Sequence, residues 1–310
     1  MPDAIIRTMT GDIEPAQLGL TLVHEHVYCD FAAATGDRDL EFTDEEAIAA
    51  DLAEAREHEV EALVEVSTYD MHAAPERVAA LCGAARLMVV KSTGWFRSPW
   101  LDELVSDRSR AELAQRLVDD IRHGFTGTRM RAGVIGEVGI SGARPTSAEA
   151  KALDAAAEAA VSTGVGIVAH TDDWGNACAV LDHLTRRRVP AERIMLGHAR
   201  VADPVSGQQE LVEAGITLAF DQLGHPERDA VPAVAARIEE LARRGCDKNI
   251  ALSADLGRRS RLRSAGGSGY AGAVRRLLDL LLRAGLDDGA RASLAGGAAA
   301  RFLAFASEVP

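Results

Sequence analysis

Short apolar runs alternate with longer amphipathic segments along most of the chain. The apolar runs are rich in Val, Ile, Leu and Ala, which is typical of buried strands, and the longer segments space their apolar residues as a helix does. The segment at residues 43–58, for example, begins with a capping residue and an acidic first turn. The predicted strands are residues 21–26, 62–68, 87–93, 133–139, 165–171, 194–198, 216–221 and 249–255, and the predicted helices are residues 43–58, 75–85, 102–123, 147–163, 176–187, 204–214, 231–244 and 271–284.

Eight strands that are each followed by a helix form the pattern of an α/β fold, the (β/α)8 TIM barrel. We therefore expect a single domain over residues 1–310. An open doubly wound sheet is the main alternative, but it would place a glycine-rich phosphate-binding turn after the first strand, and no such turn is present there. A short apolar segment, residues 4–8, precedes a turn at Gly11 and Asp12 and lies outside the repeat.

Composition narrows the range of partners. Hydrophobic residues make up 47% of the chain and aromatic residues 4%, so we expect a core of aliphatic side chains. The net charge of −13 repels phosphate backbones and anionic lipids. The sequence also contains no run of about 18 uncharged apolar residues, the length needed to span a membrane. The N-terminal segment lacks a secretory leader pattern, and the four cysteines lack the spacing of a disulfide framework or a thiolate zinc site. These features predict a cytoplasmic protein without a nucleic-acid or membrane partner.

Six side chains that can bind metal ions stand at the ends of predicted strands. The two-residue period of a strand places His24 and His26 on one face. The complete set is His24, His26, Glu137, His170, His198 and Asp255. Because barrel active sites lie at the carboxyl ends of the strands, we expect these side chains to converge. Four imidazoles and two carboxylates suit Zn²⁺, with Mn²⁺ or Co²⁺ as alternatives, and exceed one tetrahedral shell, which favours two ions bridged by a carboxylate.

Each of these residues also has a simpler interpretation. A lone histidine such as His170 or His198 is more often a hydrogen-bonded core residue than a ligand. Glu137 could pair with an arginine, and Asp255 could cap a helix. Six such coincidences at the same end of successive strands make a shared metal site the better interpretation.

Three further polar residues lie near the same strand ends. Strand alternation points Glu25 out of the barrel, towards a supporting role or a contact with a helix. His225 follows the seventh strand in a loop and is a weak candidate for the wall of the pocket. Lys91 lies near the end of the third strand. It could form an ion pair with Glu137 or Glu65, contact the substrate, or compete with Glu137 for the role of bridging the two metal ions.

Five segments carry a resemblance to a known family: residues 18–26 (LGLTLVHEH), 133–139 (GVIGEVG), 169–171 (AHT), 196–198 (LGH) and 252–255 (LSAD). Together they resemble the phosphotriesterase-like family of the amidohydrolase superfamily, from about residue 6 to about residue 305. The resemblance implies a binuclear metal hydrolase in which His24, His26 and Asp255 hold the more buried ion. It also implies that His170 and His198 hold the more exposed ion, and that Asp255 takes the proton from the attacking hydroxide.

The fourth strand departs from the phosphotriesterases proper, which carry a carboxylated lysine there. This sequence has Glu137 instead and is similar to the branch of the family that bridges its ions with glutamate. A carbamate and a carboxylate both offer two oxygens that share one negative charge, so the exchange is chemically sensible. It makes phosphotriesters a poor expectation for the natural substrate, whereas lactonase and amidase activities occur among relatives.

The walls of the pocket are expected to come from the loops after the third, seventh and eighth strands. Trp95 and Phe96 follow the third strand, and either cap the barrel or contact the substrate. Four arginines lie between residues 258 and 263 after the eighth strand. Such a run is usually a solvated face, but beside a metal site it could bind an anionic group, and Arg258 and Arg259 are the closest to Asp255 in sequence.

Together these observations predict a metal-dependent hydrolase that acts on a small molecule. The expected reaction is attack of a metal-bridging hydroxide on an ester-like carbonyl, most plausibly that of a lactone, with Asp255 as the proton shuttle. One alternative is an N-acyl amide hydrolase or a phosphotriesterase that uses the same site. Another alternative is a non-catalytic metal-binding barrel. The resemblance also favours a homodimer, although no interface is legible in the sequence.

Overall fold

The computed structural model describes residues 4–306, so the two ends of the predicted domain, residues 1–3 and 307–310, lie outside the described residues. Its largest sheet has eight parallel strands in the order β12-β11-β10-β9-β8-β7-β6-β3. The strands are β3 (Leu20–Glu25), β6 (Val60–Glu65), β7 (Met88–Thr93), β8 (Val134–Val138), β9 (Ile167–Ala169), β10 (Ile194–Leu196), β11 (Thr217–Phe220) and β12 (Ile250–Leu252).

The first and last strands of this sheet meet just beyond their ends. The Asp255 amide donates to the His24 carbonyl at 3.2 Å, and the His26 amide donates to the Leu256 carbonyl at 3.3 Å. These bonds form a seam that brings β12 against β3 and closes the sheet. The predicted α/β barrel is therefore confirmed.

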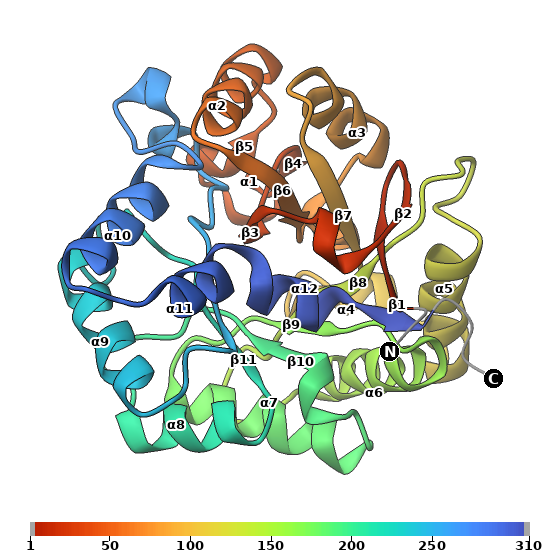
Figure 1. The fold of residues 1–310 in the computed structure, drawn as a ribbon. Coiled ribbons are helices and arrows are strands. Elements are labelled where there is room, and N and C mark those ends of the chain that lie inside the picture. The colour runs from red at the N-terminus through yellow and green to blue at the C-terminus, as the bar shows by residue number, and fades with distance from the viewer. Residues whose placement is uncertain (1–3, 307–310) are drawn as a thin grey trace.

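Helices surround the barrel and cover its outer face (Figure 1). Their apolar stripes follow helical spacing: α10 buries Ala273, Val274, Leu277 and Leu281. The surrounding helices are α2 (Glu45–Glu57), α3 (Pro75–Ala84), α5 (Arg110–Arg122), α6 (Ser147–Thr163), α7 (Trp174–Arg186), α8 (Val205–Glu213), α9 (Val231–Arg243) and α10 (Gly272–Arg283).

The single helix predicted over residues 102–123 is wrong. The structure has a short helix α4 (Asp102–Val105) and then α5, which begins after Ser109. The Ser109 hydroxyl accepts a hydrogen bond from the Glu112 amide, and the Glu112 carboxylate accepts one from the Ser109 amide. This capping box starts a new helix, and the Ser-x-x-Glu pattern could have revealed it.

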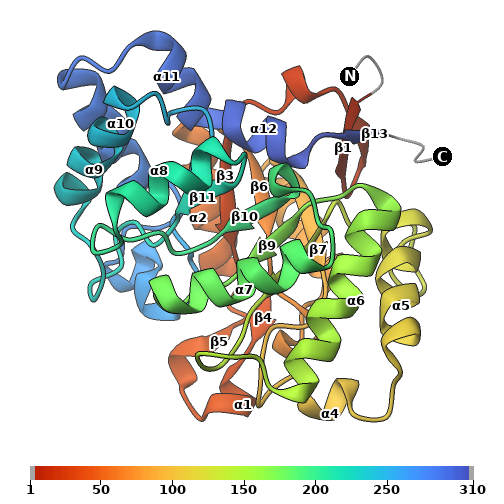
Figure 2. The same ribbon diagram turned by 90° about the horizontal axis from the view of Figure 1, so that it is seen from below.

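The two ends of the barrel carry different additions (Figure 2). At one end lie β1 (Ala4–Thr8), β2 (Gly11–Ile13) and β13 (Phe305–Ala306), which form a three-stranded sheet, and helices α11 (Asp288–Ala292) and α12 (Ala298–Leu303). At the opposite end lie the hairpin of β4 (Cys29–Asp30) and β5 (Glu41–Phe42) and the helix α1 (Ala32–Thr35). The latter additions follow β3 directly and so belong to the carboxyl end of the strands, where barrel active sites lie.

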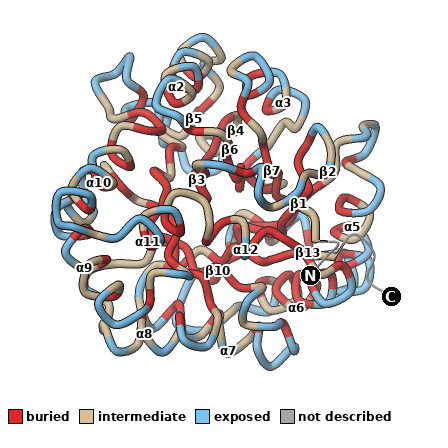
Figure 3. The backbone as a smooth tube through the Cα atoms, in the orientation of Figure 1, coloured by how far each residue is buried: buried red, intermediate tan, exposed pale blue. Residues whose placement is uncertain are grey.

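Buried residues concentrate at the centre of the molecule and exposed residues form its outer ring (Figure 3). An inner cluster of Ala and Val side chains, including Ala62, Val64, Ala219 and Ala251, is separate from the larger cluster between sheet and helices. Within residues 4–306, no helix is both long and apolar enough to cross a membrane.

Candidate metal centre

The structure brings the six predicted metal ligands together at the carboxyl ends of β3, β8, β9, β10 and β12. Glu137 lies between two pairs of histidines. Its Oε2 is 3.4 Å from His24 Nε2 and 2.9 Å from His170 Nδ1, and its Oε1 is 3.6 Å from His26 Nε2. His198 Nε2 lies 2.9 Å from His170 Nδ1. The arrangement gives two candidate groups that share one carboxylate: His24, His26 and Glu137, and Glu137, His170 and His198.

Asp255 faces the first of these groups. Its Oδ1 lies 3.5 Å from His26 Nε2 and 3.8 Å from His24 Nε2, and its Oδ2 accepts a hydrogen bond from the Gln222 amide at 3.0 Å. Asp255 has φ of 52° and His198 has φ of 62°, in the left-handed region that non-glycine residues rarely adopt. Such backbone strain is common at functional sites, where the surrounding structure holds it in place.

The strands that carry the ligands are irregular at the site. The pairing of β3 with β6 shifts between Leu22 and Glu25, and the pairing of β8 with β9 shifts between Ile135 and Val138. Bulges of this kind re-aim side chains next to active sites. The two irregularities fall on the segments that carry His24 and Glu137.

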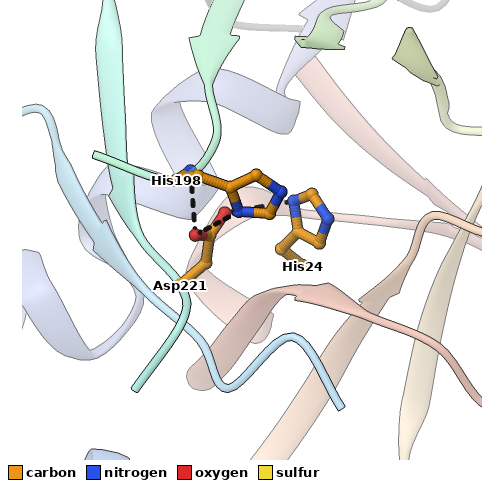
Figure 4. A group of neighbouring side chains, drawn as sticks. All are labelled: His24, His198 and Asp221. Carbon is orange, nitrogen blue, oxygen red and sulfur yellow. Dashed lines mark hydrogen bonds and ion pairs between the residues drawn. The ribbon is translucent and has the colours of Figure 1, made fainter. Parts of the chain in front are cut away.

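Asp221 is a central residue that the sequence analysis did not single out (Figure 4). Its two carboxylate oxygens lie 3.1 Å from His24 Nδ1 and 2.9 Å from His198 Nδ1, so one buried group contacts both rings. Burial alone would raise the pKa of Asp221, but these histidines hold it at about 2. The available signal was a carboxylate at the end of the seventh predicted strand, the same position that Asp255 has at the end of the eighth.

The other two histidines have separate partners. His26 Nδ1 lies 2.8 Å from the Ser67 hydroxyl, which donates to Glu65, and Glu65 pairs with Lys91 at 2.8 Å. Lys91 is therefore an ion-pair partner of Glu65, one of the roles that the sequence left open. All the groups in this chain of contacts are buried.

His170 is held from the other side of its ring. Its Nε2 lies 3.1 Å from the Asp172 carboxylate, and Asp172 pairs with Arg97. Each of the four rings therefore has one nitrogen beside an oxygen that can accept its proton, while its other nitrogen faces Glu137, Asp255 or a neighbouring ring. Outer partners of this kind fix the tautomer of metal-binding histidines.

These residues fit a metal centre by a test that does not depend on resemblance. Both ring nitrogens of His24 are fully buried and have no hydrogen-bond partner, although each lies near a carboxylate oxygen. Burial alone would lower the pKa of His24, but Glu137 and Asp221 raise it well above its ordinary value. Burial would likewise raise the pKa of Glu137, but His24 and His170 hold it well below its usual range. The buried carboxylates thus stay ionised and stabilise a positive charge beside them, and a bound cation would supply that charge.

Glu25 points away from the ligands, as strand alternation predicts, and supports the backbone around Asp255. Its Oε1 accepts hydrogen bonds from the Ser253 hydroxyl at 2.6 Å and the Ala254 amide at 2.7 Å, and its Oε2 accepts one from the Leu256 amide at 2.8 Å. Burial raises the pKa of Glu25 to about 7. Glu25 is thus a positioning residue for the segment that carries Asp255.

A cavity of about 190 Å³ opens over the cluster. It is lined by His26, Cys29, Phe31, Leu40, Met71, Phe96, Glu137, Gln222, His225, Arg228, Asp255, Gly257, Arg258 and Arg261. A larger hollow, of about 760 Å³, lies beside residues such as Gly19 and Ala300 near the opposite end of the barrel, away from these titratable groups.

Of the four predicted substrate contacts, Phe96 and Arg258 line this cavity, and the centre of the Phe96 ring is 4.8 Å from that of His170. The other two predictions are not supported by their placement. Trp95 follows the end of β7, is only 2% exposed and packs beside Tyr69, so it is a core residue. Arg259 is outside the cavity lining and faces Glu41 at 3.9 Å.

Comparison with known proteins agrees with this geometry. The model of the phosphotriesterase family matches residues 4–294. A phosphotriesterase homology protein of Escherichia coli is 29% identical over 256 residues, which cover 81% of this chain and 86% of that protein. An N-acetyltaurine hydrolase of Salmo salar is 24% identical, over 91% of this chain and 93% of that protein.

A solved structure of the Escherichia coli phosphotriesterase homology protein, with phosphate in its active site, superposes on this chain with a TM-score of 0.88. The superposition covers 93% of this chain and 99% of the other, at 27% identity. The family match spans nearly all of the described residues and includes every strand of the barrel. This chain therefore belongs to the phosphotriesterase family and is a hydrolase of that family.

Proposed function

We propose that this hydrolase cleaves an ester-like bond, with a lactone as the first candidate substrate and two divalent metal ions, Zn²⁺ in the first place, as cofactors. The observation that carries the proposal is the position of Glu137, between one histidine pair at His24 and His26 and a second at His170 and His198. A single carboxylate shared by two groups of imidazoles is the donor set of a binuclear hydrolase site.

The residues that would hold the ions are His24, His26, Glu137, His170, His198 and Asp255. Two cations bound there would polarise the scissile carbonyl and make water easier to deprotonate. The chain itself supplies the geometry. Asp221, Ser67 and Asp172 keep the four imidazole rings in fixed orientations.

Asp255 is the residue that we assign to proton transfer. It borders the cavity, and Gln222 and the Glu25-held backbone fix its carboxylate in place. Burial would raise the pKa of Asp255, but the neighbouring His26, His198 and His24 hold it well below its ordinary value. An ionised carboxylate at this point can accept a proton and return it to the leaving oxygen.

An amide substrate is the second candidate, because the chain is similar to an N-acetyltaurine hydrolase over nearly its whole length. Amide cleavage requires the departing nitrogen to be protonated, and Asp255 is the candidate donor for that step as well. Phosphotriester hydrolysis is the third candidate, on the basis of the family name alone. A non-catalytic barrel is disfavoured, since all six candidate ligands and their supporting partners are present.

The proposal is tested by metal analysis and a substrate panel. Protein purified without chelators should contain about two divalent ions per chain, and the zinc-loaded protein should hydrolyse lactones faster than N-acyl amides or phosphotriesters. Asp255→Asn should lower kcat by on the order of 10² or more. Faster turnover of N-acyl amides than of lactones would make an amide the better candidate substrate. A folded, zinc-supplemented sample with neither metal nor turnover would overturn the proposal.

A further inference from the structure

Three arginines line the cavity over the metal centre: Arg228, Arg258 and Arg261. The chain as a whole is strongly acidic, with a net charge of −13, but these three guanidinium groups lie beside candidate metal ligands. The three differ in what they contact, and the difference shows which of them is available to a bound molecule.

Arg261 has a structural role. It is only 5% exposed, and its guanidinium donates to the backbone carbonyls of Ala254, Asp255 and Leu223. These bonds tie the loop after β11 to the segment that carries Asp255. A side chain held by three carbonyls on two segments stabilises the mouth of the barrel and is not available to a ligand.

Arg258 is largely neutralised by the protein itself. Its guanidinium lies 2.9 Å from the Asp37 carboxylate and 3.5 Å from that of Asp39. Both aspartates belong to the segment between α1 and β5, and Asp39 also accepts bonds from the Ser260 amide and hydroxyl. Arg258 and Ser260 therefore bind this acidic segment to the loop after β12.

Arg228 differs from both of these residues. It stands in the loop between β11 and α9, where its amide donates to the His225 carbonyl in a tight turn. The carboxylate of the neighbouring residue Asp229 has another partner, since it accepts a hydrogen bond of 2.7 Å from the Val201 backbone amide. Among the described residues, no carboxylate oxygen lies within 4 Å of the Arg228 guanidinium, although the side chain lines the cavity.

The groups around His225 make this side of the cavity positively charged. His225 lines the same cavity, and burial together with the nearby Arg261, Arg228 and Arg258 lowers its pKa, although Asp255 opposes the shift. His225 is therefore neutral near pH 7 and does not compete with Arg228 for an anion. The apolar part of the lining comes from Phe31, Leu40, Met71 and Phe96.

We propose that Arg228 binds an oxyanion, such as a carboxylate, on the substrate at a point remote from the bond that is cleaved. The inference rests on the proposed function for the location of the reacting end, which lies at the metal centre. It defines the substrate class further: a small acyl compound whose reactive carbonyl and anionic group are close enough to fit together in a cavity of about 190 Å³. A guanidinium without a protein partner is well suited to such a group.

The test compares the binding of succinate and propionate to the zinc-loaded protein by calorimetry. Both acids can place one carboxylate at the metal centre, but only succinate has a second carboxylate for Arg228. Succinate should bind roughly 10-fold or more tightly than propionate, as expected for one charge-assisted hydrogen bond. Arg228→Met should abolish this preference, and Arg228→Lys should retain part of it.

Arg259→Met is the matched control, because it removes the same charge from a nearby arginine outside the cavity. The control should keep the preference for succinate. Equal affinity for the two acids in the wild-type protein, or an equal loss in the Arg228 and Arg259 variants, would overturn the proposal. Neither acid can be hydrolysed, so this result is independent of the substrate panel, and failure of one proposal is distinguishable from failure of the other.

Discussion

Three histidines of the candidate metal centre, His24, His198 and His170, are supported in two different ways. His24 and His198 both lie against a single carboxylate, Asp221, which is completely buried. His170 has its own acceptor, Asp172, whose side chain is 43% exposed and which is itself held by Arg97. One buried carboxylate thus orients a ring in each of the two candidate groups, whereas the exposed carboxylate orients one ring in one group. The difference indicates which variants should disturb both ions and which should disturb one.

The largest effect is expected from Asp221→Asn. Asparagine replaces one carboxylate oxygen with an NH2 donor, so the two sides of its amide cannot both accept a proton from His24 Nδ1 and His198 Nδ1. Because a lost outer partner typically costs 10- to 100-fold in metal affinity, loss at both groups should lower zinc affinity by on the order of 10² or more. Elemental analysis after dialysis against a weak chelator measures this. Retention of two ions by the variant would show that Asp221 does not link the groups.

Lys91→Met tests the third kind of support, the buried chain from His26 to Lys91. The substitution leaves the Glu65 charge buried without its cationic partner, which should reduce the free energy of unfolding by about 3–5 kcal/mol. Urea denaturation of the metal-free protein provides the measurement. The double variant with Glu65→Gln should recover part of the loss, since it removes the unpaired charge. A single variant as stable as the wild type would show that the ion pair contributes little.

Asp70 is a buried carboxylate near the cavity whose hydrogen bonds go to Thr68 and the Phe96 amide rather than to a histidine. Burial raises its pKa to about 6, although these bonds oppose the shift. The folded protein therefore binds a proton more tightly than the unfolded chain does, and stability falls as the pH rises from about 4 to about 6.

Asp70→Asn should remove this dependence. The difference in unfolding free energy between the metal-free wild type and the variant should change by on the order of 2–3 kcal/mol across that range, with the wild type losing stability as the pH rises. Parallel pH profiles for the two proteins would contradict the assignment.

The smallest effect is expected from Asp172→Asn. Only His170 loses its acceptor, and the exposed position allows water to replace the lost bond. The affinity for one ion should fall by roughly 10-fold while the other ion stays bound. Zinc titration with a colorimetric chelator would resolve the two ions. A loss of both ions, as in Asp221→Asn, would remove the distinction between the two kinds of support.

Sequence patterns predicted the barrel well because its strands and helices have strong and different periodicities. The six candidate ligands could be picked out because they are His, Glu and Asp residues at the ends of apolar runs. Asp221 has the same position at the end of the seventh run and could have been included on that ground, but the sequence gives no sign of which side chains it contacts. Its role depends on two rings from β3 and β10, which only the folded barrel brings together.

The loops were harder to interpret. Arg259 and Trp95 are near the site in sequence, but one faces Glu41 and the other turns into the core. Arg228 carries no sequence motif, and its availability follows from where the carboxylates Asp37, Asp39 and Asp229 are engaged. An arginine that is close to a metal ligand in sequence is therefore not always a pocket residue, because an acidic segment from another part of the chain can pair with it.

The seam between the first and last barrel strands has a consequence for how the site is assembled during folding. The segments around His24 and Asp255 are separated by more than 200 residues in the chain, and they meet only when the Asp255 amide reaches the His24 carbonyl. On a ribosome, the N-terminal ligands are synthesised long before their C-terminal counterpart. The closing of so large a loop is slow and entropically costly, so high-affinity metal capture should accompany closure of the barrel and not precede it.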